Sequence, residues 1–350
     1  MPYRPALPVL CLAIVSALSL PFPVASASAA TTPIAAMPSA VEAQSLALTR
    51  ASAAVVGLRA VALEDARSLA TLGRERQGSG VVIGADGLVL TIGYLILEAE
   101  LVLLVTDDER QVPARVLAYD TATGFGLVQA LVPLNLAPVP LGNAAAVGTS
   151  EPLMMASGGG EGTVGMARLL SRRAFSGFWE YHVEDALFTV PPRQDHSGAG
   201  LFNQRGELVG IGSLLVGDAN APDSPRQPGN MFISIDLLKP ILAELRERGS
   251  TSASRRAWLG LNCVEYEGQV RVMRVSDDSP AEVAGLEPGD FIVRIDGTSV
   301  WRLEQFYKAL WRGASPEREI VLDIRRDGKP QTLKVQAVDR AKTLRHAVGI

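Results

Sequence analysis

Ser197 lies in a segment whose composition is typical of a loop that presents a nucleophilic hydroxyl group. Residues 195–201 are Asp-His-Ser-Gly-Ala-Gly-Leu, so a histidine precedes the serine and two glycines follow closely. A lone serine hydroxyl is a poor nucleophile at pH 7 and needs a base within hydrogen-bonding reach. The chain has only three histidines that could supply this base, namely His182, His196 and His346.

The positions of these histidines leave the base in question. His196 adjoins Ser197, and adjacent side chains in an extended or tightly turned segment usually point apart. His182 lies in residues 179–183, a predicted strand, where a hydrogen-bonded structural role is the competing interpretation. His346 belongs to the C-terminal tail, and we expect it to be solvated.

Composition excludes several other kinds of chemistry. No His or Cys pair has the spacing of metal ligands, so we expect no metal ion or other cofactor. The net charge of −4 provides no basic field for nucleic acid. With 47% hydrophobic and 20% charged residues, the 350-residue chain has the balance of globular domains.

The first 29 residues have the pattern of a signal peptide. Arg4 precedes an apolar run at 7–20, and Ala-x-Ala cleavage patterns occur within 25–29. We therefore expect export, or a membrane anchor if the leader is not cleaved. Removal of the leader would leave Cys263 as the only cysteine, which rules out an intrachain disulfide.

From about residue 53, short apolar runs alternate with turn residues, as in β-sandwiches and barrels. Predicted strand pairs are 81–83 with 88–90, 101–106 with 112–119, and 201–202 with 208–211. A helix is predicted from an N-cap at Asp236 to a stop at Gly249. In a second unit, strands are predicted at 270–275, 291–295, 320–325 and 332–337, with a helix at 303–311.

Several motifs, taken in order, resemble the HtrA/Deg family of trypsin-like serine proteases with one C-terminal PDZ domain. They are residues 78–91, 141–143, 157–160, 197–211, 258–261 and 278–300. The resemblance implies a mainly β fold, with a two-barrel trypsin-like domain followed by an α+β PDZ domain. The domain boundaries that we expect are 1–29 signal peptide, 30–52 linker or arm, 53–249 trypsin-like domain, 250–256 linker, 257–340 PDZ domain and 341–350 tail.

Carried over position by position, this resemblance indicates a degenerate catalytic triad. Ser197 falls on the nucleophile, Tyr94 on the histidine and Gly124 on the aspartate, whereas Asp120 is not the triad acid. Residues 195–197 (Asp195, His196 and Ser197) form the oxyanion loop, with Asp195 in place of the usual glycine. Loss of the base costs such enzymes on the order of 10⁴ to 10⁶ in rate.

The PDZ-like unit predicts capture of peptide C-termini. A peptide would add as a strand beside the residues after Leu261, and loop amides would hold its carboxylate. The predicted peptide-binding residues are Trp258, Leu259, Gly260, Leu261, Phe306 and Leu310. The helix that carries Phe306, Leu310 and Trp311 would form the other wall of the groove. Core packing is the alternative role for Phe306 and Trp311.

The resulting hypothesis is an exported, periplasmic pseudoprotease that binds unfolded proteins or C-terminal peptide segments in protein quality control. An active protease homologue and further copies of the chain are the other partners that the resemblance suggests. The alternative is an active serine endopeptidase in which Ser197 uses His182 or His196 as a non-standard base. A pure scaffold is a third interpretation.

Overall fold

The computed structural model describes residues 39–345, except 150, 160–161, 222–224 and 314. The predicted signal peptide and His346 lie outside these described residues. From Ser39 onward the chain forms one compact unit.

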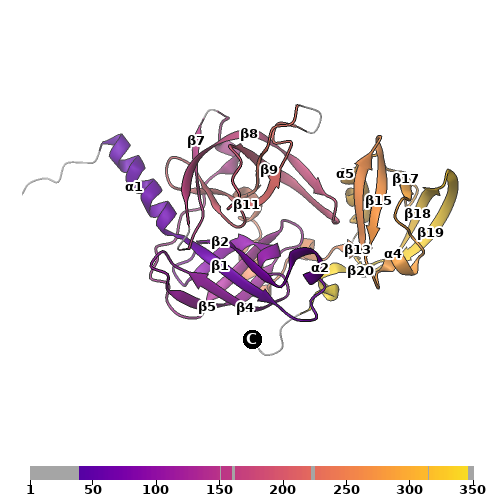
Figure 1. Cartoon of the computed structure of the whole chain (residues 1–350), viewed down its shortest axis with the longest axis horizontal. Coiled ribbons are helices and arrows are strands. Elements are labelled where there is room, and N and C mark those ends of the chain that lie inside the picture. The colour runs from indigo at the N-terminus through magenta and orange to yellow at the C-terminus, as the bar shows by residue number, and fades with distance from the viewer. Residues whose placement is uncertain (1–38, 150, 160–161, 222–224, 314, 346–350) are drawn as a thin grey trace, which may run out of the picture. The chain divides into compact units, whose positions relative to one another are not determined.

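Two closed, six-stranded antiparallel barrels form the first part of this unit (Figure 1). Around the first barrel the strand order is β1-β2-β3-β6-β5-β4, and around the second it is β10-β11-β12-β9-β8-β7. The first barrel contains β1 (Val55–Ala62), β2 (Glu75–Val82), β3 (Leu88–Ile92), β4 (Ala99–Val105), β5 (Gln111–Tyr119) and β6 (Phe125–Ala130). The second contains β7 (Pro152–Ala156), β8 (Val164–Gly177), β9 (Tyr181–Val190), β10 (Gly200–Phe202), β11 (Leu208–Val216) and β12 (Gly229–Ser234). The predicted two-barrel architecture is confirmed.

The predicted PDZ domain has its own sheets and its own hydrophobic core. Its strands are β13 (Ala257–Trp258), β14 (Leu261–Tyr266), β15 (Gln269–Val275), β16 (Phe291–Ile295), β17 (Thr298–Ser299), β18 (Glu319–Arg326), β19 (Lys329–Gln336) and β20 (Val338–Asp339), and its helices are α4 (Pro280–Val283) and α5 (Leu303–Leu310). In the order β14-β15-β16-β18-β19, strand β14 lies at an edge of the sheet. Asp327 and Gly328 both have positive φ, at 49° and 78°, which suits the tight turn between β18 and β19.

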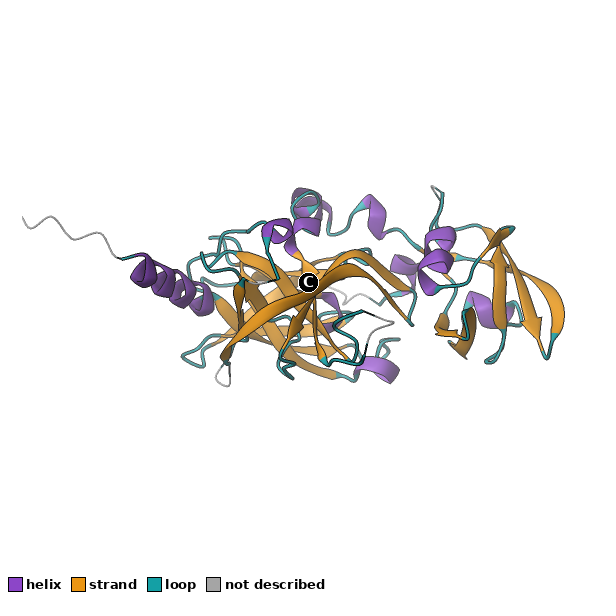
Figure 2. Cartoon of the chain, turned by 90° about the horizontal axis from the view of Figure 1, so that it is seen from above, coloured by secondary structure: helices purple, strands orange, loops and turns teal. Residues whose placement is uncertain are grey.

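The helices of the barrel region differ in part from expectation (Figure 2). They are α1 (Ala40–Ala53), α2 (Leu69–Leu72) and α3 (Leu242–Arg248). Much of the predicted arm is helical, because Ser39 and Glu42 form a capping box that starts α1. The predicted helix start at Asp236 is wrong. A 3₁₀ turn, η3 (Ile235–Leu237), precedes α3, and Pro240 disfavours helical geometry at the residue before it. Gly249 ends α3 in the left-handed conformation, as predicted.

The predicted linker at 250–256 is held against the first barrel. Thr251 and Ser254 are both buried. Their hydroxyl groups donate to the buried carboxylate of Asp120, over 3.0 Å in the case of Thr251. Asp120 also accepts a hydrogen bond of 2.9 Å from the amide of Thr123. Its carboxylate therefore ties the segment that leads to the PDZ domain to the loop between β5 and β6.

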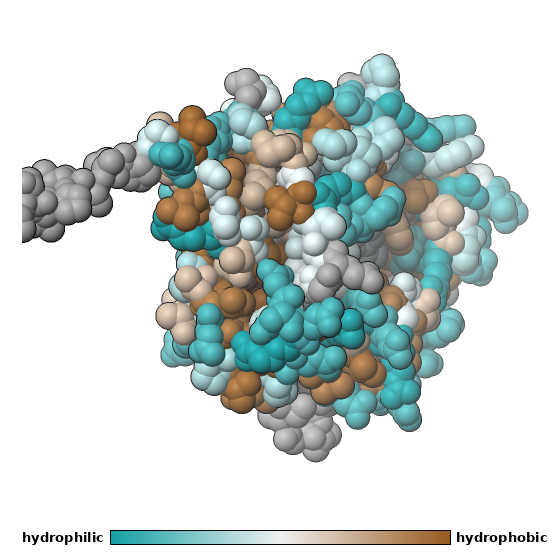
Figure 3. Space-filling view, turned by 60° about the vertical axis from the view of Figure 1, so that its left-hand side comes forward, coloured by the Kyte–Doolittle hydropathy of each residue, from teal (hydrophilic) through white to brown (hydrophobic). Residues whose placement is uncertain are grey.

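Apolar residues lie among polar ones on the face that Figure 3 shows. The buried apolar residues of the two barrels pack into one continuous core.

Within the described ranges, no helix is both long and apolar enough to span a bilayer.

Candidate functional site

The two barrels bring Tyr94 and Ser197 into direct contact. Tyr94 lies in the 3₁₀ turn η1 (Gly93–Leu95), immediately after β3, and Ser197 lies in the turn between β9 and β10. Tyr94 Oη is 2.8 Å from Ser197 Oγ and 2.8 Å from the carbonyl oxygen of Ser213 in β11. The side chain at the expected position of the base thus reaches the serine, but it is a phenol.

The backbone fixes the position of the serine. The amide of Ser79 in β2 donates to the carbonyl oxygen of Ser197 over 2.8 Å. Gly198 has φ +73°, and a Cβ atom there would lie 2.0 Å from the Ser79 carbonyl oxygen. A glycine is therefore required directly after Ser197.

Tyr94 cannot take the proton of Ser197 near neutral pH. Burial raises the pKa of Tyr94 to about 12, against the opposing effect of the hydrogen bond with Ser197. At pH 7 only about one phenol in 10⁵ is then ionised. The neutral phenol has one proton of its own to donate, and the Ser213 carbonyl can only accept. The contact is therefore a hydrogen bond between hydroxyl groups and not a nucleophile–base pair.

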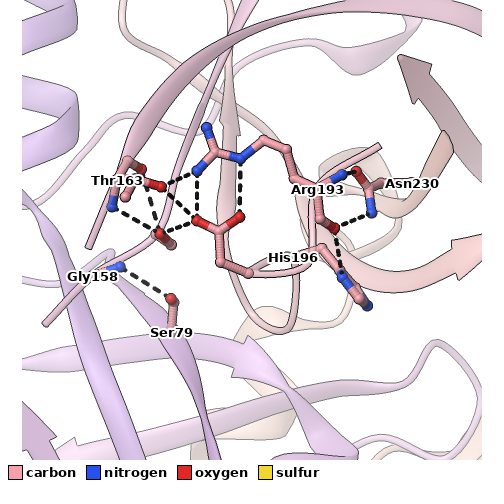
Figure 4. Close-up of polar contacts among 8 residues, drawn as sticks. Ser79, Gly158, Thr163, Arg193, His196 and Asn230 are labelled. Carbon is pink, nitrogen blue, oxygen red and sulfur yellow. Dashed lines mark hydrogen bonds and ion pairs between the residues drawn. The ribbon is translucent and has the colours of Figure 1, made fainter. Parts of the chain in front are cut away.

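The two described histidines make other contacts. His196 Nδ1 is 3.0 Å from the carbonyl oxygen of Arg193, and Figure 4 shows its ring beside that carbonyl. His182 Nδ1 in β9 is 2.8 Å from Ser176 Oγ in β8, and its Nε2 is 3.3 Å from Glu184. Burial lowers the pKa of both imidazoles. Among the residues that the structure describes, no hydrogen bond joins either ring to Ser197 Oγ.

The Asp195 carboxylate is paired with neighbouring side chains, of which Figure 4 labels Thr163 and Arg193. It accepts hydrogen bonds from Arg193 Nε at 3.0 Å, Ser157 Oγ at 2.5 Å and Thr163 Oγ1 at 2.7 Å. Burial acts to raise the pKa of Asp195, but these hydrogen bonds outweigh burial and hold it well below its usual range. Arg193 balances the charge of Asp195. The main obstacle to catalysis is therefore the lack, among the described residues, of a base that contacts Ser197.

The expected position of the acid holds no carboxylate. Gly124 has φ +86°, and a Cβ atom at this position would lie 3.0 Å from Tyr181 Oη. The Gly124 carbonyl oxygen accepts a hydrogen bond of 2.7 Å from the amide of Gly93, beside Tyr94. Backbone contacts therefore occupy the place from which an aspartate would orient an imidazole.

A cleft of about 500 Å³ opens beside Ser197. Residues of both barrels line it, including Arg59, Gln77, Ser79 and Gly158. Ser197 is itself part of the lining of this cleft.

The predicted PDZ groove residues lie along one side of β14. Trp258 ends β13, and Leu259 and Gly260 form the loop that leads into β14 at Leu261. Gly260 has φ +87°, and a Cβ atom there would lie 2.3 Å from that of Ser279, so the loop needs a glycine. Phe306 and Leu310 of α5 are buried members of the PDZ core.

One group of possible metal ligands occurs among the described residues. Ligand atoms of His182, Glu184 and Glu304 lie within 4.8 Å of one another. The Lys308 ammonium group forms ion pairs with Glu184 at 3.0 Å and with Glu304 at 2.7 Å. These carboxylates are thus already paired with a cation.

Comparison with known proteins identifies both domains. The profile of the trypsin-like peptidase domain matches residues 78–211, and that of the PDZ domain matches residues 257–337. A probable periplasmic serine endoprotease DegP-like of Ectopseudomonas mendocina is 26% identical over 285 residues, which cover 75% of this chain and 57% of that protein. The chain is HtrA-like. It has a trypsin-like peptidase domain followed by a PDZ domain.

A further relative agrees with this assignment, and solved structures agree with the fold. The DegP-like protein of Halomonas elongata is 25% identical, with 79% of the HtrA-like chain and 59% of that protein covered. Structures of the HtrA-type protease AlgW with a decapeptide and of a serine endoprotease from Yersinia pestis share its fold. Their TM-scores are 0.53 and 0.52 at 20% and 21% identity, over 85% and 87% of this chain and 98% and 99% of theirs. The chain spans less than 60% of the length of the curated relatives described here.

Some residues of the site could not be identified from the sequence. Ser213 supplies the carbonyl that contacts Tyr94, and Thr163 binds Asp195, yet neither has a local motif. Arg193 lies two residues before Asp195, and this opposite-charge pair is the one feature of the sequence that could have indicated their contact.

Proposed function

We propose that this HtrA-like chain is an exported pseudoprotease that binds unfolded or C-terminal peptide segments in protein quality control. The observation that carries the proposal is the hydrogen bond of 2.8 Å between Tyr94 Oη and Ser197 Oγ. It places a protonated phenol where acyl transfer by serine requires a base. Three features are compatible with a protein that still binds peptides. They are the open cleft, the nucleophile loop held in place by backbone hydrogen bonds, and the PDZ domain.

The periplasm is the proposed location. The predicted leader at 1–29 supports export, and the curated relatives are named periplasmic proteins. Fractionation of cells expressing the full chain tests this proposal, because a mature, shortened protein should appear in the periplasmic fraction. An uncleaved protein in the membrane fraction would favour an anchored form.

Digestion of unfolded casein, beside a Ser197→Ala control, tests the absence of peptidase activity. We expect the wild type and the control to be equally inactive, and both to resist labelling by a fluorophosphonate at pH 7.5. Cleavage by the wild type that disappears in Ser197→Ala would show instead that the chain is a serine endopeptidase with a non-standard base.

Fluorescence anisotropy tests the binding function. Peptides with a free C-terminus should bind, whereas the same peptides with an amidated C-terminus should not, because the loop at 258–261 recognises a carboxylate. Equal binding of both forms would argue against capture of C-termini.

A further inference from the structure

The turn between β8 and β9 lies in the groove of the PDZ domain. This turn, Phe178–Trp179–Glu180, belongs to the second barrel, and we call it the hairpin tip. The Glu180 carboxylate accepts hydrogen bonds from the amide of Leu261 at 2.8 Å and from that of Leu259 at 3.2 Å. These amides belong to the loop expected to bind a peptide carboxylate.

The hairpin tip also forms a strand-like contact with the free edge of β14. The amide of Cys263 donates to the carbonyl oxygen of Phe178 over 2.8 Å. The Phe178 carbonyl thus contacts residue 263 and the Glu180 side chain contacts residue 261, so the tip runs antiparallel to β14. The amides of residues 261 and 263 face the same edge because strand residues alternate in direction. A peptide that ended at the carboxylate loop would use the same two donors.

Helix α5 closes the other side of the groove over the hairpin tip. The hydroxyl group of Tyr307 donates to the carbonyl oxygen of Gly177 over 2.8 Å and accepts from the amide of Glu180 over 3.2 Å. Tyr307 is fully buried, next to the expected wall residue Phe306. The helix was predicted as the groove wall, but the residue that contacts the bound segment was not identified from the sequence.

This contact buries a carboxylate group, which the packing of two domains does not require. Glu180 is 2% exposed, and burial of a carboxylate is costly unless donors surround it. Burial raises the pKa of Glu180, and the loop amides and Arg340 oppose this rise. The Arg340 guanidinium also donates to the Glu180 carbonyl oxygen over 2.7 Å. An apolar residue would pack at such a contact at lower cost, so the carboxylate matches the loop specifically.

We propose that the hairpin tip is an internal ligand of the PDZ groove, with Glu180 in the place of a peptide's terminal carboxylate. A peptide C-terminus must therefore displace the tip before it can bind. Its apparent affinity is its intrinsic affinity multiplied by the fraction of molecules in which the groove is empty. Binding would free the end of a hairpin whose two strands belong to the second barrel. This inference rests on the proposed function only for the identity of the competing ligand.

The first test needs no peptide. Hydrogen exchange is measured at the amides of Leu259, Leu261 and Cys263 in the full chain, in Glu180→Ala and in Glu180→Gln. We expect Glu180→Ala to lose protection at these amides by at least about tenfold, because their acceptor is removed. Glu180→Gln keeps the shape of the side chain and should lose less. Glu184→Gln is the matched control, since it removes a neighbouring exposed carboxylate and should change nothing at these amides.

The second test measures competition. A pool of fluorescein-labelled decapeptides, with a free C-terminus and an apolar last residue, is titrated into the same four proteins. Glu180→Ala should bind the pool at least about tenfold more tightly than the wild type, and Glu184→Gln should bind like the wild type.

The two measurements separate the inference from the proposed function. Unchanged protection in Glu180→Ala would overturn the internal ligand, and so would measurable binding of the pool by Glu180→Ala and the wild type with equal affinity. Lost protection without peptide binding by any variant would support an internal ligand and would refute the proposed capture of C-termini.

Discussion

Replacement of Tyr94 by histidine tests whether the missing base alone keeps Ser197 inactive. With a pKa of about 12, roughly 3 in 10⁵ Tyr94 side chains are ionised at pH 7.5. An imidazole with the reference pKa of 6.5 is about 90% unprotonated at that pH. The substitution therefore increases the fraction of available base by on the order of 10⁴.

The expected gain in rate is smaller than this increase. A positioned general base contributes about 10² to 10⁴ in rate. Gly124 supplies no carboxylate to orient the ring, and loss of the orienting aspartate costs such triads about 10⁴. We therefore expect a gain near the lower end, about 10²-fold over the wild type.

The assay is the rate at which a fluorophosphonate labels Ser197, followed by mass spectrometry from pH 5.5 to 8.5. Labelling of Tyr94→His should increase with pH with a midpoint near 6.5, the reference value for histidine. Tyr94→Phe is the matched control, since it removes the phenol hydroxyl without adding a base, and Tyr94→His combined with Ser197→Ala should not react. Labelling of the wild type as fast as Tyr94→His would refute the reasoning, because a base would then already be present. No gain in Tyr94→His would show that a base at position 94 is not sufficient to activate Ser197.

Three further predictions concern stability. Gly124→Asp should lower the free energy of unfolding by about 2 kcal/mol in urea titrations, because φ is +86° and the new Cβ lies 3.0 Å from Tyr181 Oη; an unchanged midpoint would contradict this. Asp120→Ala should lower the free energy of unfolding by about 3 kcal/mol in the same assay, because the buried donors of Thr123, Thr251 and Ser254 lose their acceptor. A decrease below about 1 kcal/mol would argue against Asp120 as the residue that holds the linker to the barrel. Burial lowers the folded-state pKa of His182 below 6.5. The unfolded state therefore binds more protons, and the free energy of unfolding decreases as the pH falls below 6.5. The decrease is at most about 1.4 kcal/mol per pH unit. The change in Tm between pH 7.5 and 5.5 should therefore be smaller in His182→Gln than in the wild type, and an equal change would rule out this contribution.

The fold class was predictable because its signals are local. Alternating apolar residues and turn residues such as Asp327 and Gly328 mark the hairpins, and the structure confirms the two barrels and the PDZ domain. Element ends were less accurate. The helix predicted from Asp236 starts at Leu242 after Pro240, and the capping box that begins α1 was overlooked.

The residue types at the candidate site can be read from the order and spacing of the motifs, which place Ser197, Tyr94 and Gly124 at the triad positions that the resemblance implies. How these residues meet follows from the packing of the two barrels, which brings hydroxyl oxygens of residues 103 positions apart to 2.8 Å from each other. The same holds for Glu180 and Leu261, which lie 81 positions apart. No local pattern encodes such a contact, because the position of a carboxylate relative to a distant amide depends on how whole elements pack.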